Sequence, residues 1–206
     1  ADARRRAPSE TPAAALIVAL PETPGQDPLP GAASDAGLLG HLTRTVLTGP
    51  NASRANVLGA LSRHRWLHFS GHATQDLTDP LAGGLLPDDW ETAGLITVAD
   101  LTGPEHLGGE FAFLAACKTA TGGVGVADEV ITVAAALQHA GWRHVIGTLW
   151  TVPDRRAAKV TAEFYAELRC DDGLDPAETA RALHRAVREV GGSHPALWAS
   201  FIHLGP

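Results

Sequence analysis

Short apolar runs, each bounded by glycine, proline or charged residues, recur along the chain. Runs of this length with such boundaries are typical of strands that are buried on both faces of a sheet. The sequence therefore predicts strands over residues 15–20, 65–71, 110–117, 144–150 and 197–204.

Between these runs, apolar positions recur at the three- and four-residue spacing of helices. Helices are predicted over 35–42, from a cap at Asn51 or Ser53, after Thr97 or Asp100, and over 128–140, 154–169 and 175–190. Strands alternate with helices, and consecutive strands lie too far apart to form hairpins. This pattern predicts an α/β fold, with a mostly parallel central sheet and helices on both faces.

The composition of the 206 residues is that of a chain with a substantial core, since 45% are hydrophobic and 19% are charged. Residues 1–12 combine arginines with prolines, which predicts a linker or disordered segment, followed by one domain over 13–206. The chain contains no methionine, so we expect it to be part of a longer protein.

Charge and hydropathy exclude two classes of partner. The formal net charge of −7 has the sign of a phosphate backbone, which argues against nucleic acid as the main partner. No apolar run approaches the roughly 20 residues of a membrane span, so no membrane partner is expected. The two cysteines, Cys117 and Cys170, form no CxxC pair, which argues against a disulfide framework or structural zinc and favours a reducing, cytoplasmic location.

Two reactive side chains follow two of the predicted strands. His72 comes after the run 65–71, and Cys117 comes at the end of the run 110–117. Working residues of parallel sheets gather beyond the carboxyl ends of the strands. If these two strands are neighbours, a thiol and an imidazole face the same crevice.

This pair has the chemistry of a nucleophile and its base. A nearby imidazole raises the reactivity of a cysteine by ion pairing or by removing its proton, and can then protonate a leaving amine. The tetrahedral intermediate also needs donors for its oxyanion, for which the backbone amides of Ala73 and Cys117 are the candidates. The alternative for Cys117 is a buried core thiol. His68, four residues before His72 on the same strand, is interpreted as a packed or hydrogen-bonded residue.

Six blocks of sequence resemble the CHAT domain, a caspase-like module that occurs with the HetF protein and is often appended to TPR repeats. In chain order they are WLHFSGH (66–72), LAACKTA (114–120), ADEVI (127–131), VIGTLW (145–150), Phe164-Tyr165, and His194-Pro195 through Trp198. Together they span nearly the whole chain.

The resemblance implies a caspase-like three-layer α/β sandwich and peptide-bond hydrolysis by a His/Cys dyad, which falls on His72 and Cys117. It implies a protein or peptide substrate, a TPR or sensor region upstream in the parent chain, and no metal or organic cofactor. This chain departs from the family pattern at Ala73, where glycine is usual, and at Ala115 and Lys118 beside the cysteine. A caspase that cuts after aspartate has a glutamine at the position of Ala115, so we do not expect cleavage after aspartate.

Two further residues are candidates for the substrate pocket. Asp128 is either the first-turn residue of a helix or, as the resemblance to the wider clan allows, an acidic wall for a basic P1 side chain. Trp150 either lines the pocket or packs beneath the loop that contains it.

Two other functions remain as alternatives. The altered surroundings of Cys117 fit a CHAT-like module that binds or scaffolds a partner without cleaving it. A nucleotide-binding domain is disfavoured, because Pro21-Glu22-Thr23-Pro24 follows the first strand where a glycine-rich turn is required.

Overall fold

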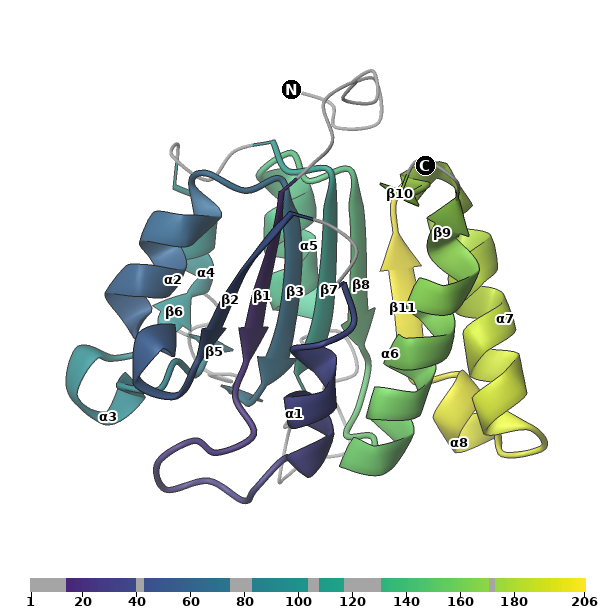
Figure 1. The fold of residues 1–206 in the computed structure, drawn as a ribbon, viewed down its shortest axis with the longest axis horizontal. Helices are drawn as coiled ribbons and strands as arrows, with labels where there is room; N and C mark the ends of the chain where they lie inside the picture. Colours follow the sequence, from purple (N-terminus) through teal and green to yellow (C-terminus); the bar gives the residue numbers. More distant parts are fainter. Residues whose placement is uncertain (1–13, 40–42, 75–82, 104–107, 117–130, 171–172) are drawn as a thin grey trace.

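A six-stranded sheet forms the middle of the molecule, with the strand order β11-β8-β7-β3-β1-β2 (Figure 1). The structure is a computed structural model that describes residues 14–39, 43–74, 83–103, 108–116, 131–170 and 173–206. Neighbouring strands are parallel except β8 and β11, which are antiparallel. The mostly parallel sheet predicted from the sequence is therefore confirmed. Its strands are β1 (Ala15–Ala19), β2 (Arg44–Thr48), β3 (Trp66–Gly71), β7 (Phe111–Ala116), β8 (His144–Thr148) and β11 (Phe201–Leu204).

Helices cover both faces of this sheet (Figure 1). Side chains alternate along β1, so that Ile17 packs into one core cluster, while Leu16 and Val18 pack into the other. Burial on both faces explains why the strands are continuous apolar runs. The arrangement is consistent with a caspase-like sandwich. One face carries α1 (Pro30–Asp35), α6 (Asp154–Leu168), α7 (Thr179–Gly191) and α8 (Pro195–Trp198), and the other carries α2 (Arg54–Leu61), α4 (Val98–Leu101) and α5 (Ile131–His139).

Smaller elements lie outside the central sheet. An antiparallel three-stranded sheet follows β3, and a two-stranded one follows α6. Together with short helical turns they occupy the connections between the main elements. These elements are β4 (Ala73–Thr74), β5 (Gly84–Leu85), β6 (Ile96–Thr97), β9 (Arg169–Cys170), β10 (Gly173–Leu174), α3 (Trp90–Ala93), and the 3-10 helices η2 (Gly49–Ala52) and η4 (Pro176–Glu178).

Two of the predicted helix caps are present. The Ser53 side chain accepts a hydrogen bond from the Asn56 amide at the start of α2. At the start of α4, Thr97 Oγ1 accepts from the Asp100 amide at 3.2 Å, and Asp100 Oδ2 accepts from the Thr97 amide at 2.8 Å. This reciprocal capping box satisfies two backbone donors that the first helical turn leaves without partners.

The helix predicted over 35–42 is wrong in position. Helix α1 begins at Pro30 and ends at Asp35, and a turn follows in which the Gly37 amide donates to Ser34 O. Proline fits the first turn of a helix, and glycine weakens a helix interior, so these two residue types favour the earlier segment. The apolar pattern also missed β2, whose side chains are at least partly exposed because it is one of the two edge strands of the sheet.

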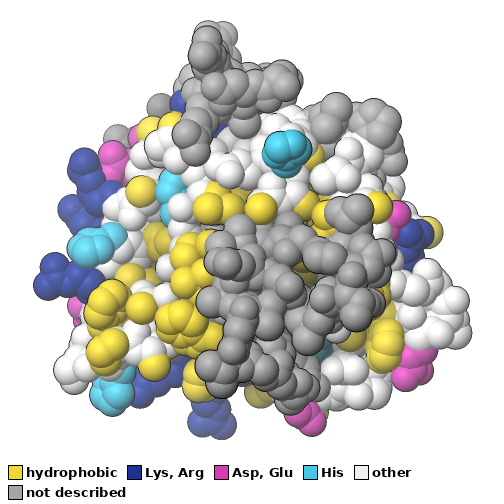
Figure 2. All heavy atoms as spheres, turned by 180° about the vertical axis from the view of Figure 1, so that it is seen from behind, with side chains coloured by type: hydrophobic (Ala, Val, Ile, Leu, Met, Phe, Trp, Pro, Cys, Tyr) yellow, Lys and Arg dark blue, Asp and Glu magenta, His cyan; other side chains and the backbone are white. Residues whose placement is uncertain are grey.

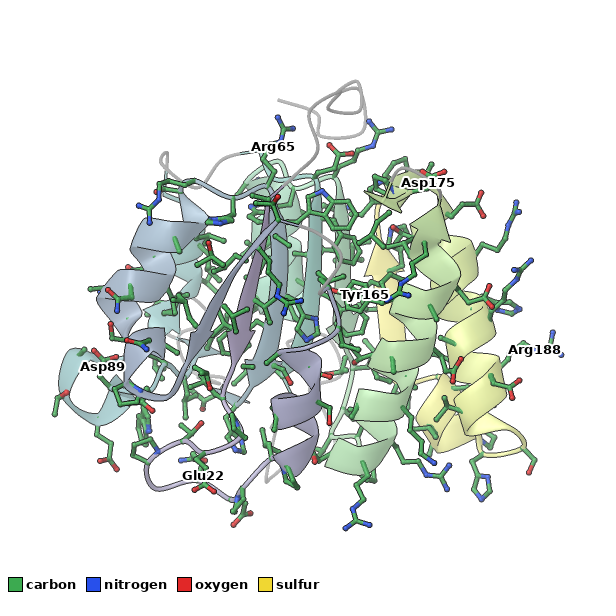
Figure 3. All side chains as sticks on the ribbon, in the orientation of Figure 1. Glu22, Arg65, Asp89, Tyr165, Asp175 and Arg188 are labelled. Carbon is green, nitrogen blue, oxygen red and sulfur yellow. The ribbon has the colours of Figure 1, made fainter. Side chains whose placement is uncertain are left out.

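The outer surface of α6 and α7 is charged. Arg185 Nη1 on α7 contacts Glu167 Oε2 on α6 at 2.8 Å, and Figure 3 shows charged side chains such as Arg188 pointing outward from this side. In the view from behind, Lys and Arg side chains gather at the margin of the molecule (Figure 2). None of the helices within the described ranges has the length and apolar character that crossing a membrane requires.

A pair of histidines joins β8 to β11 at the amino end of β8. His144 Nδ1 lies 3.1 Å from His203 Nε2, and the two rings are stacked with centroids 5.3 Å apart. Burial is the largest cause that lowers the pKa of His144 to about 4, and the neighbouring His203 and Arg143 contribute to this shift. Burial also lowers the pKa of His203. Both imidazoles are therefore neutral partners in the folded protein at neutral pH.

This pair predicts a loss of stability in mild acid. In the unfolded chain His144 takes up its proton near pH 6.5, whereas in the folded chain it does so only near pH 4, so the unfolded state binds more protons between these values. The free energy of unfolding should consequently fall as the pH falls through this window. Urea denaturation at several pH values should show a flatter dependence for the double variant His144→Gln/His203→Gln. The exposed-histidine control His184→Gln should keep the wild-type dependence, and equal slopes in all three proteins would contradict the prediction.

Candidate active site

The two strands that precede the predicted dyad lie side by side and are parallel. Ser70 pairs with Ala115, and Gly71 pairs with Ala116, so β3 and β7 end at the same level of the same sheet edge. His72 is the next residue after β3. Cys117 is the next residue after β7 in the sequence and lies outside the described residues, as does Asp128.

The connection after β1 lies next to this edge. The strand order reverses at β1, which pairs with β2 on one side and with β3 on the other. Such a reversal is the place where open α/β sheets form their binding crevice. The 21–29 loop, between β1 and α1, is closed by a bond from the Leu29 amide to Pro21 O at 2.8 Å. Trp90 Nε1 also donates to Pro24 O in this loop, at 2.8 Å.

His72 contacts the backbone of this loop. Its side chain is buried, with the residue only 3% exposed, and Nε2 lies 2.9 Å from Asp27 O. A carbonyl oxygen can only accept, so Nε2 carries the hydrogen and donates it. In the neutral ring Nδ1 then has the free lone pair. Nδ1 is buried and has no hydrogen-bond partner among the described residues, so the nitrogen that can take up a proton is Nδ1.

The amide of Ala73 points away from its neighbouring strand. His72 O accepts from the Leu86 amide at 3.0 Å, which directs this carbonyl toward β5. Carbonyl and N–H of a trans peptide point in opposite directions, so the Ala73 N–H points away from β5. The Ala73 amide, one of the two expected to hold an oxyanion, therefore does not donate within the β4–β5 ladder. The other expected amide, of Cys117, is not among the described residues.

Thr148 contacts the last described residue of β7, and the sequence analysis did not find it. The pairing of β7 with β8 extends to Phe113 and Ile146. Beyond that point the buried Thr148 Oγ1 donates to Ala116 O at 3.3 Å. The only signal in the sequence is that Thr148 ends a strand beside the one that leads to Cys117.

Trp150 is placed against α8. Its indole Nε1 donates to Ala196 O at 2.8 Å, and the residue is 39% exposed. This contact corresponds to the packing alternative for Trp150, and it still leaves part of the indole open to solvent.

His68 is a hydrogen-bonded core residue, as expected. Its ring nitrogens lie 3.1 Å from the Tyr165 hydroxyl and 3.3 Å from Asp35 Oδ2. The sequence analysis did not predict the contacts of His68 with Asp35 and Tyr165, because these residues come from segments far from β3 along the chain. Within the described ranges, no three His, Cys, Asp or Glu side chains are grouped so that they can hold a metal ion.

We predict that His72 contributes to stability. The variant His72→Ala removes a buried side chain together with its hydrogen bond to Asp27 O, which should lower the free energy of unfolding by about 0.5–3 kcal/mol. Urea denaturation measures this loss. The control His184→Ala, at an exposed position, should change stability by less than about 0.5 kcal/mol. An unchanged midpoint for His72→Ala would show that the bond to Asp27 is not formed in solution.

The sequence was compared with protein families and with curated proteins. The family model described as CHAT domain matches residues 1–206, which is the whole chain. A search among curated proteins finds no match. The match covers both positions of the expected dyad, and it agrees with the arrangement of the sheet.

Proposed function

The chain belongs to the CHAT domain family, a caspase-like and peptidase-related family, and from this premise we propose that it is a cysteine endopeptidase that hydrolyses peptide bonds of a protein substrate. His72 is the base and then the acid, and Cys117 is the nucleophile. The observation that carries the proposal is the buried Nδ1 of His72, whose other ring nitrogen is already bonded to Asp27 O.

The pairing of β3 with β7 supports the closeness of the two side chains. Gly71 and Ala116 are paired, and His72 and Cys117 each follow by one peptide bond. Paired strands lie about 4.8 Å apart, and consecutive Cα atoms about 3.8 Å apart. This spacing supports the proposal that Cys117 lies close to His72.

In the proposed mechanism, Cys117 Sγ gives its proton to His72 Nδ1, and the thiolate attacks the scissile carbonyl carbon. The amides of Ala73 and Cys117 donate to the resulting oxyanion. The carbon–nitrogen bond then breaks, and the leaving amine takes the proton from His72 Nδ1. Water attacks the thioester carbon as His72 Nδ1 takes up one of its protons. The carbon–sulfur bond then breaks, Sγ regains the proton from His72, and the carboxylic acid product loses its remaining proton to solvent. Throughout, Asp27 O accepts from Nε2 and keeps the ring oriented.

The substrate proposals rest on single residues. Without glutamine at Ala115, cleavage after aspartate is not the preferred reaction. Asp128 is proposed as the acidic group that receives a basic P1 side chain, and the exposed part of Trp150 as a wall of the pocket. A TPR or sensor region of the parent chain is proposed to control access to the site.

Cleavage should depend on one of the two cysteines. Compared with wild type on a peptide library, Cys117→Ala should lose about 10³-fold or more in kcat, because it removes the nucleophile. Cys170→Ala is the matched control and should keep wild-type turnover. Equal turnover by wild type and Cys117→Ala would reject the assignment.

The same dyad predicts selective alkylation. Below pH 7, Cys117 should react with iodoacetamide faster than Cys170, because a neighbouring imidazole favours its thiolate. Mass spectrometry of the two cysteine peptides measures both rates in one sample. His72→Ala should reduce the rate at Cys117 to that at Cys170. Equal rates at the two cysteines of the wild type would instead favour the non-cleaving scaffold.

A further inference from the structure

A buried chain of hydrogen bonds joins three elements beside the site. His68 on β3 lies between Asp35, the last residue of α1, and Tyr165 on α6, at the distances given above. All three residues are 2% exposed. Tyr165 lies between α6 and the central sheet (Figure 3). The network therefore connects the helix that follows the 21–29 loop to the strand that precedes His72.

The direction of these bonds follows from the chemistry of the groups. A carboxylate only accepts, so His68 Nε2 donates to Asp35 Oδ2. Burial, with a contribution from the Asp35 charge, raises the pKa of Tyr165 well above its usual value. Its hydroxyl consequently keeps its proton and can donate to His68 Nδ1. Asp35 Oδ1 is buried without a partner among the described residues. The bond from His68 to Oδ2 is therefore the hydrogen bond that stabilises this buried carboxylate.

The other end of α1 is bonded to α6. The Gly31 amide donates to Asp154 Oδ2 at 2.7 Å, and Asp154 is the first residue of α6. A Cβ atom on Gly31 would come within 2.7 Å of Asp154 Oδ1 and 2.9 Å of the Ala158 Cβ, so the two helices meet closely here. Helix α1 is thus held near its start and at its end.

Burying a polar network is a costly way to stabilise a core, because apolar side chains of similar volume avoid the desolvation penalty. In some proteins such a network instead fixes the orientation of the elements that it joins. Helix α1 follows the loop directly, through the bond from the Ala32 amide to Leu29 O at 2.9 Å. A shift of α1 therefore moves the loop, and with it the Asp27 carbonyl on which His72 depends.

We propose that Asp35, His68, Tyr165 and Asp154 are positioning residues, which hold α1 so that Asp27 O keeps His72 in the Nε2–H form with Nδ1 free to take a proton. This inference rests on the proposed role of His72 as the base. These four residues would act through the position of α1, without contacting the substrate or the nucleophile.

The test uses the full chain and reads the state of the His72 ring directly. Long-range ¹H–¹⁵N NMR spectra distinguish the two neutral forms of an imidazole, and the His72→Ala spectrum identifies the signals of His72. In wild type we expect the single Nε2–H form. Tyr165→Phe removes a hydroxyl from the network, and Asp154→Ala removes the acceptor of the Gly31 amide. Each should give a mixture of the two forms and lower kcat about tenfold or more with little change in KM, since small displacements of a catalytic group have effects of this size.

Two controls separate positioning from general stability. Asp154→Asn keeps an oxygen that can accept from Gly31 and should restore the single form. Thr179→Val removes a buried hydroxyl at the first residue of α7, which donates to Pro176 O at 2.7 Å. This variant should leave the tautomer of His72 and kcat unchanged.

Each result decides between named outcomes. If folded Tyr165→Phe and Asp154→Ala keep the single Nε2–H form and wild-type kcat, the inference is overturned. It is also overturned if Thr179→Val changes the ring or kcat as much as they do. If these variants alter the ring while Cys117→Ala matches wild type in turnover, the proposed peptidase function fails, and the positioning role stands.

Discussion

Six consecutive residues of β3 pair in register with six of β7. This pairing determines where the polypeptide leaves the sheet after each of these two strands. Side chains in a strand alternate between faces, so a slip of one residue would move a whole set of side chains to the wrong core. Burial on both faces prevents such a slip. The apolar side chains of β3 and β7 therefore determine the position of the candidate site, although none of them takes part in its chemistry.

The two faces of β3 have different roles. Leu67 and Phe69 pack into the wholly apolar cluster that includes side chains of α2 and α5. His68 faces α1 and α6, where it bonds to Asp35 and Tyr165. The three polar side chains buried here, Asp35, His68 and Tyr165, are hydrogen-bonded to one another, which lowers the cost of burying them. The loop and helix that support His72 are on this same side of the sheet.

Local sequence was sufficient for the strands of the inner sheet, because a continuous apolar run needs no knowledge of its neighbours. It was insufficient for the edge strand β2, whose exposed positions give no such run. It also placed α1 too late in the chain. The contact between His68 and Tyr165 spans 97 positions, so only the assembled fold reveals it. Asp27 acts through a backbone carbonyl, which every residue type possesses, and no residue pattern could have identified it.

A neutral carbonyl is a sufficient partner for His72 because of the nucleophile that it is proposed to serve. A carboxylate beside a histidine stabilises the imidazolium by charge, which matters most when the base must deprotonate a weakly acidic hydroxyl. A thiol loses its proton far more readily. The base then needs correct orientation more than added charge, and a backbone carbonyl supplies orientation alone. The orientation of His72 then depends on the position of the 21–29 loop and of α1. This dependence gives a physical reason for the polar contacts at both ends of α1.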